Sequence, residues 1–174
     1  MQEHPRGALR SVALGYVKVR DATRSDLGQV ANIADVALRG AYDDLLPSAT
    51  VKRYLTATYS PGALSNRLSD HPIFVVEIDA ELCAFADAFI QDGGIVIAEI
   101  CTLPNWRRQG CGTGLVRRLA CMDATLPVSA DVLLGNQPGE RFYEALGFVP
   151  GETMQLQMFD TAVVERRWWH PPLN

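Results

Sequence analysis

A strand, a turn rich in arginine and glycine, and a helix follow one another over residues 95–124. The apolar run Ile-Val-Ile-Ala-Glu-Ile-Cys-Thr-Leu, over 95–103, predicts a strand that is buried on both faces. Pro104 ends this strand, because proline has no N–H group to donate to a ladder. After the turn, apolar residues recur at helical spacing, which predicts a helix that starts near Gly112.

The turn between strand and helix has the composition of an anion-binding site. The first N–H groups of a helix have no partner inside the helix, and the macrodipole makes that end positive. Glycines let a ligand approach the backbone closely, and arginines add charge-assisted bonds to phosphate. The residues concerned are Arg107, Arg108, Gly110, Gly112 and Gly114. The turn therefore predicts a phosphate site; the alternative is a turn that merely joins a strand to a helix.

Two common phosphate motifs do not fit this turn. A P-loop needs a Lys-Ser/Thr pair after its last glycine, but Gly114 is followed by Leu115. A dinucleotide fingerprint needs two residues between its second and third glycines, and here Thr113 stands alone. The glycine spacing therefore argues against a nucleotide-phosphate binder of either type.

With its flanks, the turn resembles the acyl-coenzyme A signature of the GCN5-related N-acetyltransferases (GNAT), Arg/Gln-x-x-Gly-x-Gly/Ala, here at 107–112. A second motif of that family is a strand, an asparagine, and a helix that ends in Tyr-x-x-Leu-Gly-Phe. It is matched by residues 131–136 and 141–148. The two motifs come in the family's order, and the resemblance covers about residues 17–160.

The resemblance implies an α/β fold with a mixed, mostly antiparallel sheet and flanking helices. It also implies that acetyl-CoA places its pyrophosphate on the turn, its pantetheine arm along the strand before it, and its sulfur near Tyr143. Tyr143 would protonate the departing thiolate after an amine attacks the thioester directly. The implied coenzyme contacts are Cys101, Thr102, Leu103, Arg107, Arg108, Gln109, Gly110, Cys111, Gly112, Thr113, Gly114 and Asn136.

Several of these residues have a plainer alternative role. The Tyr143 ring would also suit the core, with its hydroxyl at the surface. Asn136 could cap the next helix, but Pro138 as first helical residue favours Gln137 as the cap and leaves Asn136 free. Cys111 at a helix N-terminus could be reactive, although a small packed side chain is the better interpretation.

Two acids interrupt apolar strands, and a buried carboxylate needs a partner, water or a raised pKa. We expect Glu99 to be a candidate general base for an ammonium substrate, with a salt bridge to an arginine or a solvated edge as the alternative. Asp87 has a similar setting, and the register decides whether the two meet. A two-residue turn near 92–94 puts them on opposite faces of the sheet, and a three-residue turn sets them opposite each other on one face. By the resemblance, Tyr42 would line the acceptor pocket; packing on the first helix is the alternative.

The remaining pattern predicts alternating helices and strands. Aspartate and glycine at 92–94 predict a hairpin turn, and Gly147 a helix end. We expect strands at 17–20, 73–78, 81–90, 131–135, 154–159 and 162–168, and helices at 23–38, 49–57, 61–69, 112–124 and 138–146.

Length and composition set the outer limits. The 174 residues, 48% of them apolar, predict one domain over 16–174 after a flexible or start-site extension at 1–15. No run approaches 18 apolar residues, so we expect no membrane span and no secretory signal. A net charge of −4 argues against nucleic acid as a partner.

Cysteine and histidine usage suggest neither disulfides nor a metal. The expectation is reduced, buried thiols in a cytoplasmic protein, because Cys83, Cys101, Cys111 and Cys121 form no CxxC pair. His4, His71 and His170 have no ligand spacing, so we expect no metal. The adjacent tryptophans Trp168 and Trp169 would cover a sheet edge or sit in a homodimer interface.

These observations favour transfer of the acetyl group of acetyl-CoA to a primary amine of a small molecule. A protein or peptide amine is the alternative acceptor. A non-catalytic acyl-CoA sensor is the alternative class, since it would keep the turn but could lose the acid. The retained Tyr143 favours the enzyme.

Overall fold

In the computed structural model, which describes residues 17–173, seven strands form one sheet in the order β1-β2-β3-β4-β5-β7-β6. Only β4 and β5 pair in parallel, so the expected mixed, mostly antiparallel α/β fold is confirmed. The predicted extension at 1–15 lies outside the described residues. The strands are β1 (Lys18–Asp21), β2 (Ile73–Ile78), β3 (Glu81–Gln91), β4 (Gly94–Thr102), β5 (Val128–Leu133), β6 (Val149–Met158) and β7 (Thr161–His170).

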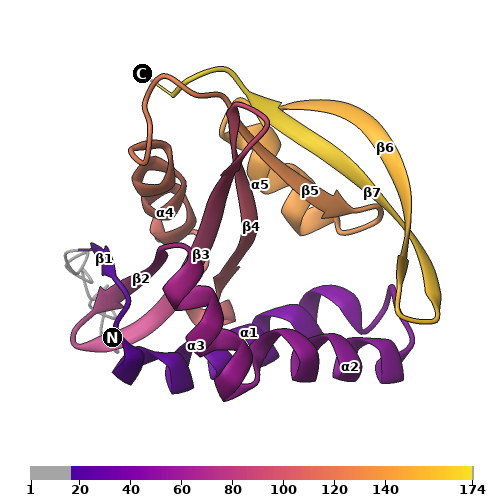
Figure 1. The fold of residues 1–174 in the computed structure, drawn as a ribbon, viewed down its shortest axis with the longest axis horizontal. Coiled ribbons are helices and arrows are strands. Elements are labelled where there is room, and N and C mark those ends of the chain that lie inside the picture. Colours follow the sequence, from indigo (N-terminus) through magenta and orange to yellow (C-terminus); the bar gives the residue numbers. More distant parts are fainter. Residues whose placement is uncertain (1–16, 174) are drawn as a thin grey trace, which may run out of the picture.

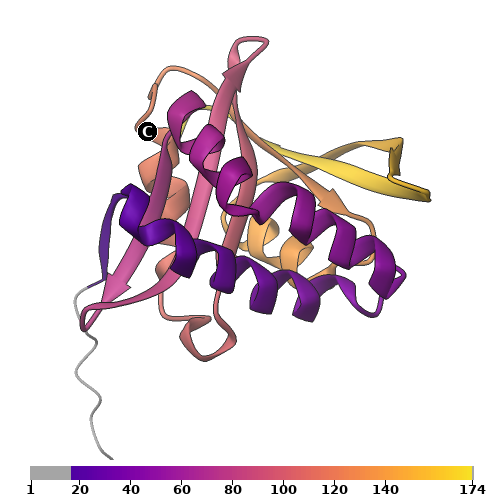
Figure 2. The ribbon, with the colours of Figure 1, turned by 60° about the horizontal axis from the view of Figure 1, so that its bottom comes forward.

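Helices cover both faces of the sheet (Figures 1 and 2). On one face lie α1 (Leu27–Tyr42), α2 (Ser48–Tyr59) and α3 (Pro61–Asp70), and on the other α4 (Cys111–Ala120) and α5 (Gln137–Ala145). The strands alternate between the two cores. Phe85 packs under α1 to α3, whereas its neighbours Ala84 and Ala86 face α4. The site described below lies between these two layers.

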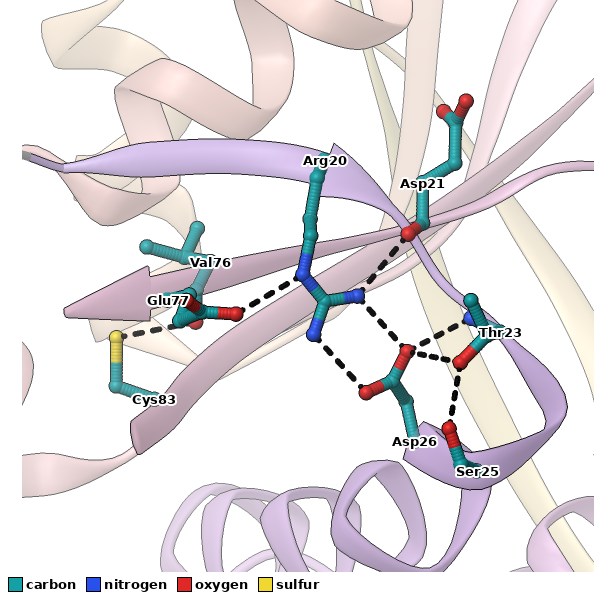
Figure 3. A network of polar contacts seen from close by, with 8 residues as sticks. All are labelled: Arg20, Asp21, Thr23, Ser25, Asp26, Val76, Glu77 and Cys83. Carbon is teal, nitrogen blue, oxygen red and sulfur yellow. Dashed lines mark hydrogen bonds and ion pairs between the residues drawn. The ribbon is translucent and has the colours of Figure 1, made fainter. Parts of the chain in front are cut away.

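Arg20 joins the first strand to the elements around it (Figure 3). Its guanidinium donates to Glu77 of β2 at 3.0 Å and to both carboxylate oxygens of Asp26 at 2.8 and 3.0 Å. Asp26 closes the short 3₁₀ turn η1 (Arg24–Asp26) and also accepts from the Thr23 N–H at 2.7 Å. The hydrogen bond from Arg20 holds the pKa of Asp26 well below its usual range. These contacts fix β1 at its edge of the sheet.

The hairpin between β3 and β4 has a two-residue turn, because Gln91 pairs with Gly94. Asp92 and Gly93 take positive φ values of 50° and 76°, which suits a tight turn of this kind. A two-residue turn alone would leave Asp87 and Glu99 on opposite faces of the sheet.

A β-bulge further along β4 changes that outcome. Ala88 pairs with Ile97 but Asp87 pairs with Glu99, so Ala98 has no partner on β3. The extra residue moves Glu99 and Cys101 onto the face under α1 to α3, whereas Ile97 faces α4. The sequence allowed a two-residue or a three-residue turn. The turn has two residues, and it is the bulge that brings Asp87 and Glu99 to the same face.

The same bulge marks where β4 and β5 part. Their only pairs are Ile95 with Val128, Val96 with Ser129 and Ile97 with Ala130. Beyond them β4 runs on to Thr102 and β5 to Leu133 without pairing to each other. Figure 1 shows the two strands diverging at this end. The sheet therefore has an unpaired edge inside it, next to the start of α4.

Some predicted boundaries moved. The helix predicted at 112–124 ends at Ala120, and the strand predicted at 131–135 covers 128–133. Gly135, with φ of 97°, turns the chain before α5. The closing hairpin of β6 and β7 is longer than predicted and inserts β7 between β5 and β6. Its tip reaches α2, where Thr161 and Thr50 hydroxyls lie 2.7 Å apart.

Candidate active site

The backbone of β4 presents alternate residues to the unpaired edge. The Leu103 N–H donates to the Cys83 carbonyl at 2.9 Å, so it faces β3. The backbone N–H and C=O groups of residues two apart on a strand point to the same side, so those of Cys101 also point towards β3. The backbone groups of Ile100 and Thr102 point the other way, to the edge from which β5 has diverged. Of the predicted pantetheine contacts on this strand, only Thr102 has its backbone groups on the open side.

The turn after β4 is exposed and ends in a left-handed glycine. Pro104–Trp106 form a 3₁₀ turn, and Gly110 caps α4 with φ of 86°. The first helical bond recorded across this cap runs from the Gly114 N–H to the Gly110 carbonyl at 2.9 Å. The N–H groups of residues 111–113 come before it and have no carbonyl of the same helix to bind. They point out of the N-terminus together with the positive end of the helix dipole.

Two of the three glycines have a packing role that the sequence did not suggest. A Cβ at Gly112 would lie 2.7 Å from Cε2 of Phe142, and one at Gly114 would lie 3.2 Å from Val19. These glycines bring α4 close to α5 and β1. Of the three, only Gly110 combines open space with a positive φ; Gly112 and Gly114 also serve close packing, and the role of all three in ligand approach stays a prediction.

The thiol of Cys111 packs inside the protein, 3.9 Å from the sulfur of Cys83. Burial raises its pKa, which fits the small packed side chain and not a reactive thiol. Cys121, at the end of α4, is exposed, so the expectation of four buried thiols is wrong at this position. Arg107, Arg108 and Gln109 are exposed on the turn.

Asn136 caps α5. Its Oδ1 accepts from the Gly139 N–H at 3.2 Å, and the helix begins at Gln137 with Pro138 inside its first turn. The prediction that Gln137 is the cap is therefore wrong. It assumed that Pro138 is the first residue of the helix, but the helix starts one residue earlier, at Gln137. The cap uses the amide oxygen and leaves the amide NH₂ as a donor.

Tyr143 lies on α5 with 4% of its surface exposed, between Phe142 and Phe148, each with its ring centroid 5.1 Å away. Burial raises the pKa of its hydroxyl far above the usual value, and the charge of Glu99 raises it further. Tyr143 is thus a neutral phenol with a proton to donate.

Glu99 sits half-buried under α2, beside the end of the β4–β5 pairing. Its Oε2 accepts from the hydroxyls of Tyr54 and Tyr59 at 3.3 and 3.4 Å, and its Oε1 from the Ile100 N–H at 3.2 Å. Burial and the neighbouring charge of Asp87 raise the pKa of Glu99 to about 7. A carboxylate with that pKa can both take and release a proton near neutral pH.

Asp87 is fully buried opposite Glu99 and has the salt bridge that was the alternative for both acids. Arg67 of α3 donates to its two oxygens at 2.7 and 2.8 Å, and His71 Nε2 lies 3.0 Å away. The Arg67 guanidinium also lies over the Tyr59 ring, 5.0 Å from its centroid. It therefore fixes both the acid and one tyrosine that contacts Glu99.

Tyrosines complete the surroundings of Glu99. Tyr42 ends α1 and packs on the core under α1 to α3; burial and then the charge of Glu99 raise its pKa. The sequence singled out Tyr42 but missed Tyr54, Tyr59 and Arg67, which belong to no motif. The only sequence signal for these three residues was the presence of acids in apolar strands. A buried acid requires polar partners, but the sequence does not indicate which elements provide them.

The other expectations concern residues away from Glu99. Trp168 is buried, whereas Trp169 is 46% exposed. Residues 17–173 contain no group of three His, Cys, Asp or Glu side chains arranged to hold a metal ion. In the same part of the chain, no helix combines the length and apolarity needed to cross a membrane.

Comparisons with known proteins identify a family for the middle of the chain. Residues 69–150 match the sequence profile of an acetyltransferase (GNAT) domain. The search of curated proteins found no match.

Solved acetyltransferase structures share the fold. The PaiA N-acetyltransferase of Thermoplasma acidophilum, in complex with coenzyme A, superposes with a TM-score of 0.74 at 17% identity, covering 87% of this chain and 97% of that one. The ribosomal-protein-S18-alanine N-acetyltransferase of Escherichia coli gives 0.67 at 17%, covering 90% and 94%. YncA of Salmonella typhimurium, a putative acetyltransferase with its cofactor acetyl-CoA, gives 0.61 at 16%, covering 91% and 95%. The resemblance based on the two motifs is confirmed.

Proposed function

We propose that this chain, which carries a GNAT acetyltransferase domain, moves the acetyl group of acetyl-CoA to a primary amine of a small molecule. One observation carries the proposal. The pairing of β4 with β5 ends beside Glu99, a carboxylate whose pKa is about 7, and Tyr143, a buried phenol, belongs to the core on the other face of the sheet. A proton acceptor and a proton donor thus flank the internal edge along which a thioester would lie.

The turn would hold the coenzyme's pyrophosphate. The unpartnered N–H groups of residues 111–113 donate to the phosphate oxygens, and Arg107 and Arg108 are exposed beside them. The pantetheine arm follows the open side of β4 and pairs with backbone at Thr102. The Asn136 amide remains available as a donor on the β5 side of the same edge.

The acceptor reaches Glu99 from the face under α1 and α2, where Tyr42 and Tyr54 remain partly exposed. Glu99 takes one proton from the ammonium, and the neutral amine attacks the carbonyl carbon. The C–N bond forms, the C–S bond breaks, and the Tyr143 hydroxyl gives its proton to the leaving sulfur. The attacking nitrogen returns its second proton to the Tyr143 oxygen, and Glu99 releases the first proton to water.

The test is thiol release from acetyl-CoA against a panel of small amines and peptides, with calorimetric titration of the coenzyme in parallel. We expect turnover on small primary amines and roughly a 10-fold lower kcat in Tyr143→Phe, since a thiolate leaves even when unprotonated. Turnover on peptides alone would favour the alternative acceptor. Coenzyme binding without turnover on any amine would favour a sensor, and no coenzyme binding would overturn the whole proposal.

Two exposed arginines, one on the turn after β4 and one away from it, provide a test of the proposed pyrophosphate site. Arg108→Ala should weaken coenzyme binding and reduce its dependence on salt, because one phosphate contact is lost. Arg141→Ala, an exposed arginine on α5 that contacts Gln137, should leave both unchanged. Equal losses in the two variants would argue against a phosphate site at the turn.

A further inference from the structure

A pocket lies between α1 and α3, near the first residues of both helices. Its volume is about 370 Å³, which is within the range of small-molecule sites. Gly28 forms part of its wall, and a Cβ added there would meet no atom within 4 Å. The space therefore opens directly beside the α1 backbone, where any side chain larger than hydrogen would begin to fill it.

The lining of the pocket is mostly apolar. Leu27 and Leu64 belong to the buried core under α1 to α3, and Ala31 packs against the same core. Pro61, the first residue of α3, adds a further apolar side chain. Such a lining binds the apolar part of a ligand, because binding removes that part from water.

Arg24 is the one cation in the part of the lining that residues 17–173 provide. Its Nη1 donates to the Ser65 hydroxyl at 3.3 Å, which is a neutral partner. The nearest acid in the sequence, Asp26, is turned toward Arg20, which pairs with it at 2.8 Å (Figure 3). Because α3 begins at the pocket, the positive end of its dipole adds to the charge of Arg24. This charge is therefore available to an anion.

The pocket is separate from the proposed site of acetyl transfer. Among residues 17–173, its lining includes neither Glu99, nor Tyr143, nor any residue of the turn at 107–114. The two sites meet at Tyr59, which lines the pocket and donates from its hydroxyl to Glu99 at 3.4 Å. A ligand in the pocket would leave the turn free and contact a neighbour of the candidate base.

We propose that this pocket is a second ligand site, which binds a small monocarboxylate with an apolar or aromatic body. The carboxylate accepts charge-assisted hydrogen bonds from the Arg24 guanidinium, and the body lies against Leu27 and Leu64. A single arginine matches the one charge and the planar shape of a carboxylate, whereas a phosphate dianion would lack a second cation. Binding at this site requires neither acetyl-CoA nor an amine.

The experiment is a titration of the free protein, labelled with ¹⁵N, with 3-phenylpropanoate, followed by two-dimensional NMR. We expect amide shifts to be largest at residues 24–31 and 59–65 and small at 107–114. Two probes each keep one half of the ligand: 3-phenylpropan-1-ol has the body without the charge, and acetate has the charge without the body. Each should bind about 10-fold or more weakly than 3-phenylpropanoate.

Variants of the pocket give a second readout. Arg24→Gln should weaken 3-phenylpropanoate binding about 10-fold, as for loss of one charged hydrogen bond. Gly28→Phe should abolish it by filling the space. Gly40→Phe is the matched control, because Gly40 lies near the other end of α1 and a Cβ there also meets no atom within 4 Å. It should leave binding unchanged, and thermal melts report whether each variant folds.

Several outcomes would overturn the proposal. Equal affinities for 3-phenylpropanoate and the alcohol would show an apolar groove without an anion site. Shifts confined to 107–114 would place the carboxylate on the turn after β4. Unweakened binding in a folded Gly28→Phe variant would place it elsewhere on the protein. If that variant fails to fold, an unweakened affinity in Arg24→Gln would overturn the proposal in the same way.

Discussion

Asp87 and Glu99 face each other across β3 and β4, and only Asp87 has a cation as partner. The pair exists because Ala98 bulges out of β4 and carries Glu99 to the face where Asp87 lies. Arg67 neutralises the Asp87 carboxylate, whereas Glu99 has a pKa of about 7 and so keeps its proton at lower pH. The arrangement separates a structural acid from a titratable one, although both interrupt apolar strands in the same way.

Replacing Glu99 by glutamine should remove the proton acceptor and keep the shape. We expect kcat/KM at pH 7.5 to fall about 100-fold or more, in line with the usual contribution of a general base. The wild-type rate should rise with pH through about 7, because only the ionised carboxylate accepts a proton. The measurement is a pH profile of kcat/KM for both proteins. An unchanged rising limb in the glutamine variant would assign it to another group.

The same substitution should stabilise the fold at high pH. The folded-state pKa of Glu99, about 7, lies above the ordinary glutamate value of 4.5, so the folded protein holds the proton more tightly than the unfolded chain. The unfolding free energy therefore falls as pH rises from about 4.5 to 7. Glu99→Gln removes this loss and should be more stable than wild type by about 1–2 kcal/mol at pH 8, with little difference at pH 4. Urea denaturation at the two pH values provides the measurement.

Replacing Asp87 by asparagine tests the second cause of the high pKa. It removes the negative charge opposite Glu99 and leaves Arg67, which lowers that pKa. We expect the midpoint of the pH–rate profile to move down by roughly one pH unit. The variant should also lose about 3 kcal/mol of stability, because Arg67 stays partly buried without its carboxylate. His71→Gln serves as a milder control: it alters a neighbour of Asp87 and keeps the charge pair. A stable variant with an unmoved midpoint would show that burial alone sets the pKa.

The sequence predicts the features that depend on neighbouring residues better than those that depend on contacts between distant parts of the chain. The strands at 73–78 and 81–91 and the turns after them follow from local pattern and turn chemistry, and their boundaries agree to within a residue. The bulge at Ala98 does not follow from such rules, because alanine there has no distinguishing property. Only the packing of both faces selects it.

The candidate site shows the same division. The turn at 107–114 and Tyr143 belong to contiguous motifs and could be located from the sequence. The partners of Glu99 come from α2 and from the neighbouring strand β3, so no sequence spacing relates them to Glu99. The cap at Asn136 was misassigned for a local reason: proline is tolerated at either of the first helical positions, and here it takes the second.

Asp26 should contribute stability that is lost in acid. Its pKa lies below the ordinary value because Arg20 holds its carboxylate, so the contribution is present above about pH 4 and fades as pH falls below it. We expect Asp26→Asn to cost about 2 kcal/mol at pH 7 and clearly less at pH 2.5, since the pair is partly exposed. Asp21→Asn, which breaks a more exposed pair with Arg118, should cost under about 0.5 kcal/mol at either pH. Equal costs for the two variants would contradict the network drawn in Figure 3.

The contact between α4 and α5 gives the clearest test of the glycine roles. Gly112→Ala would place a Cβ 2.7 Å from Cε2 of Phe142, so the ring or the helices must shift, at a cost of about 1–3 kcal/mol. Gly110→Ala meets no atom within 4 Å but strains a φ of 86°, at about 1 kcal/mol. Phe142→Leu should recover part of the loss in Gly112→Ala and none in Gly110→Ala, because only the first is a steric clash with that ring. Thermal or urea unfolding of the two double-mutant cycles measures the coupling. A coupling near zero at Gly112 would mean that the ring moves aside freely and that this glycine is not required for packing α4 against α5.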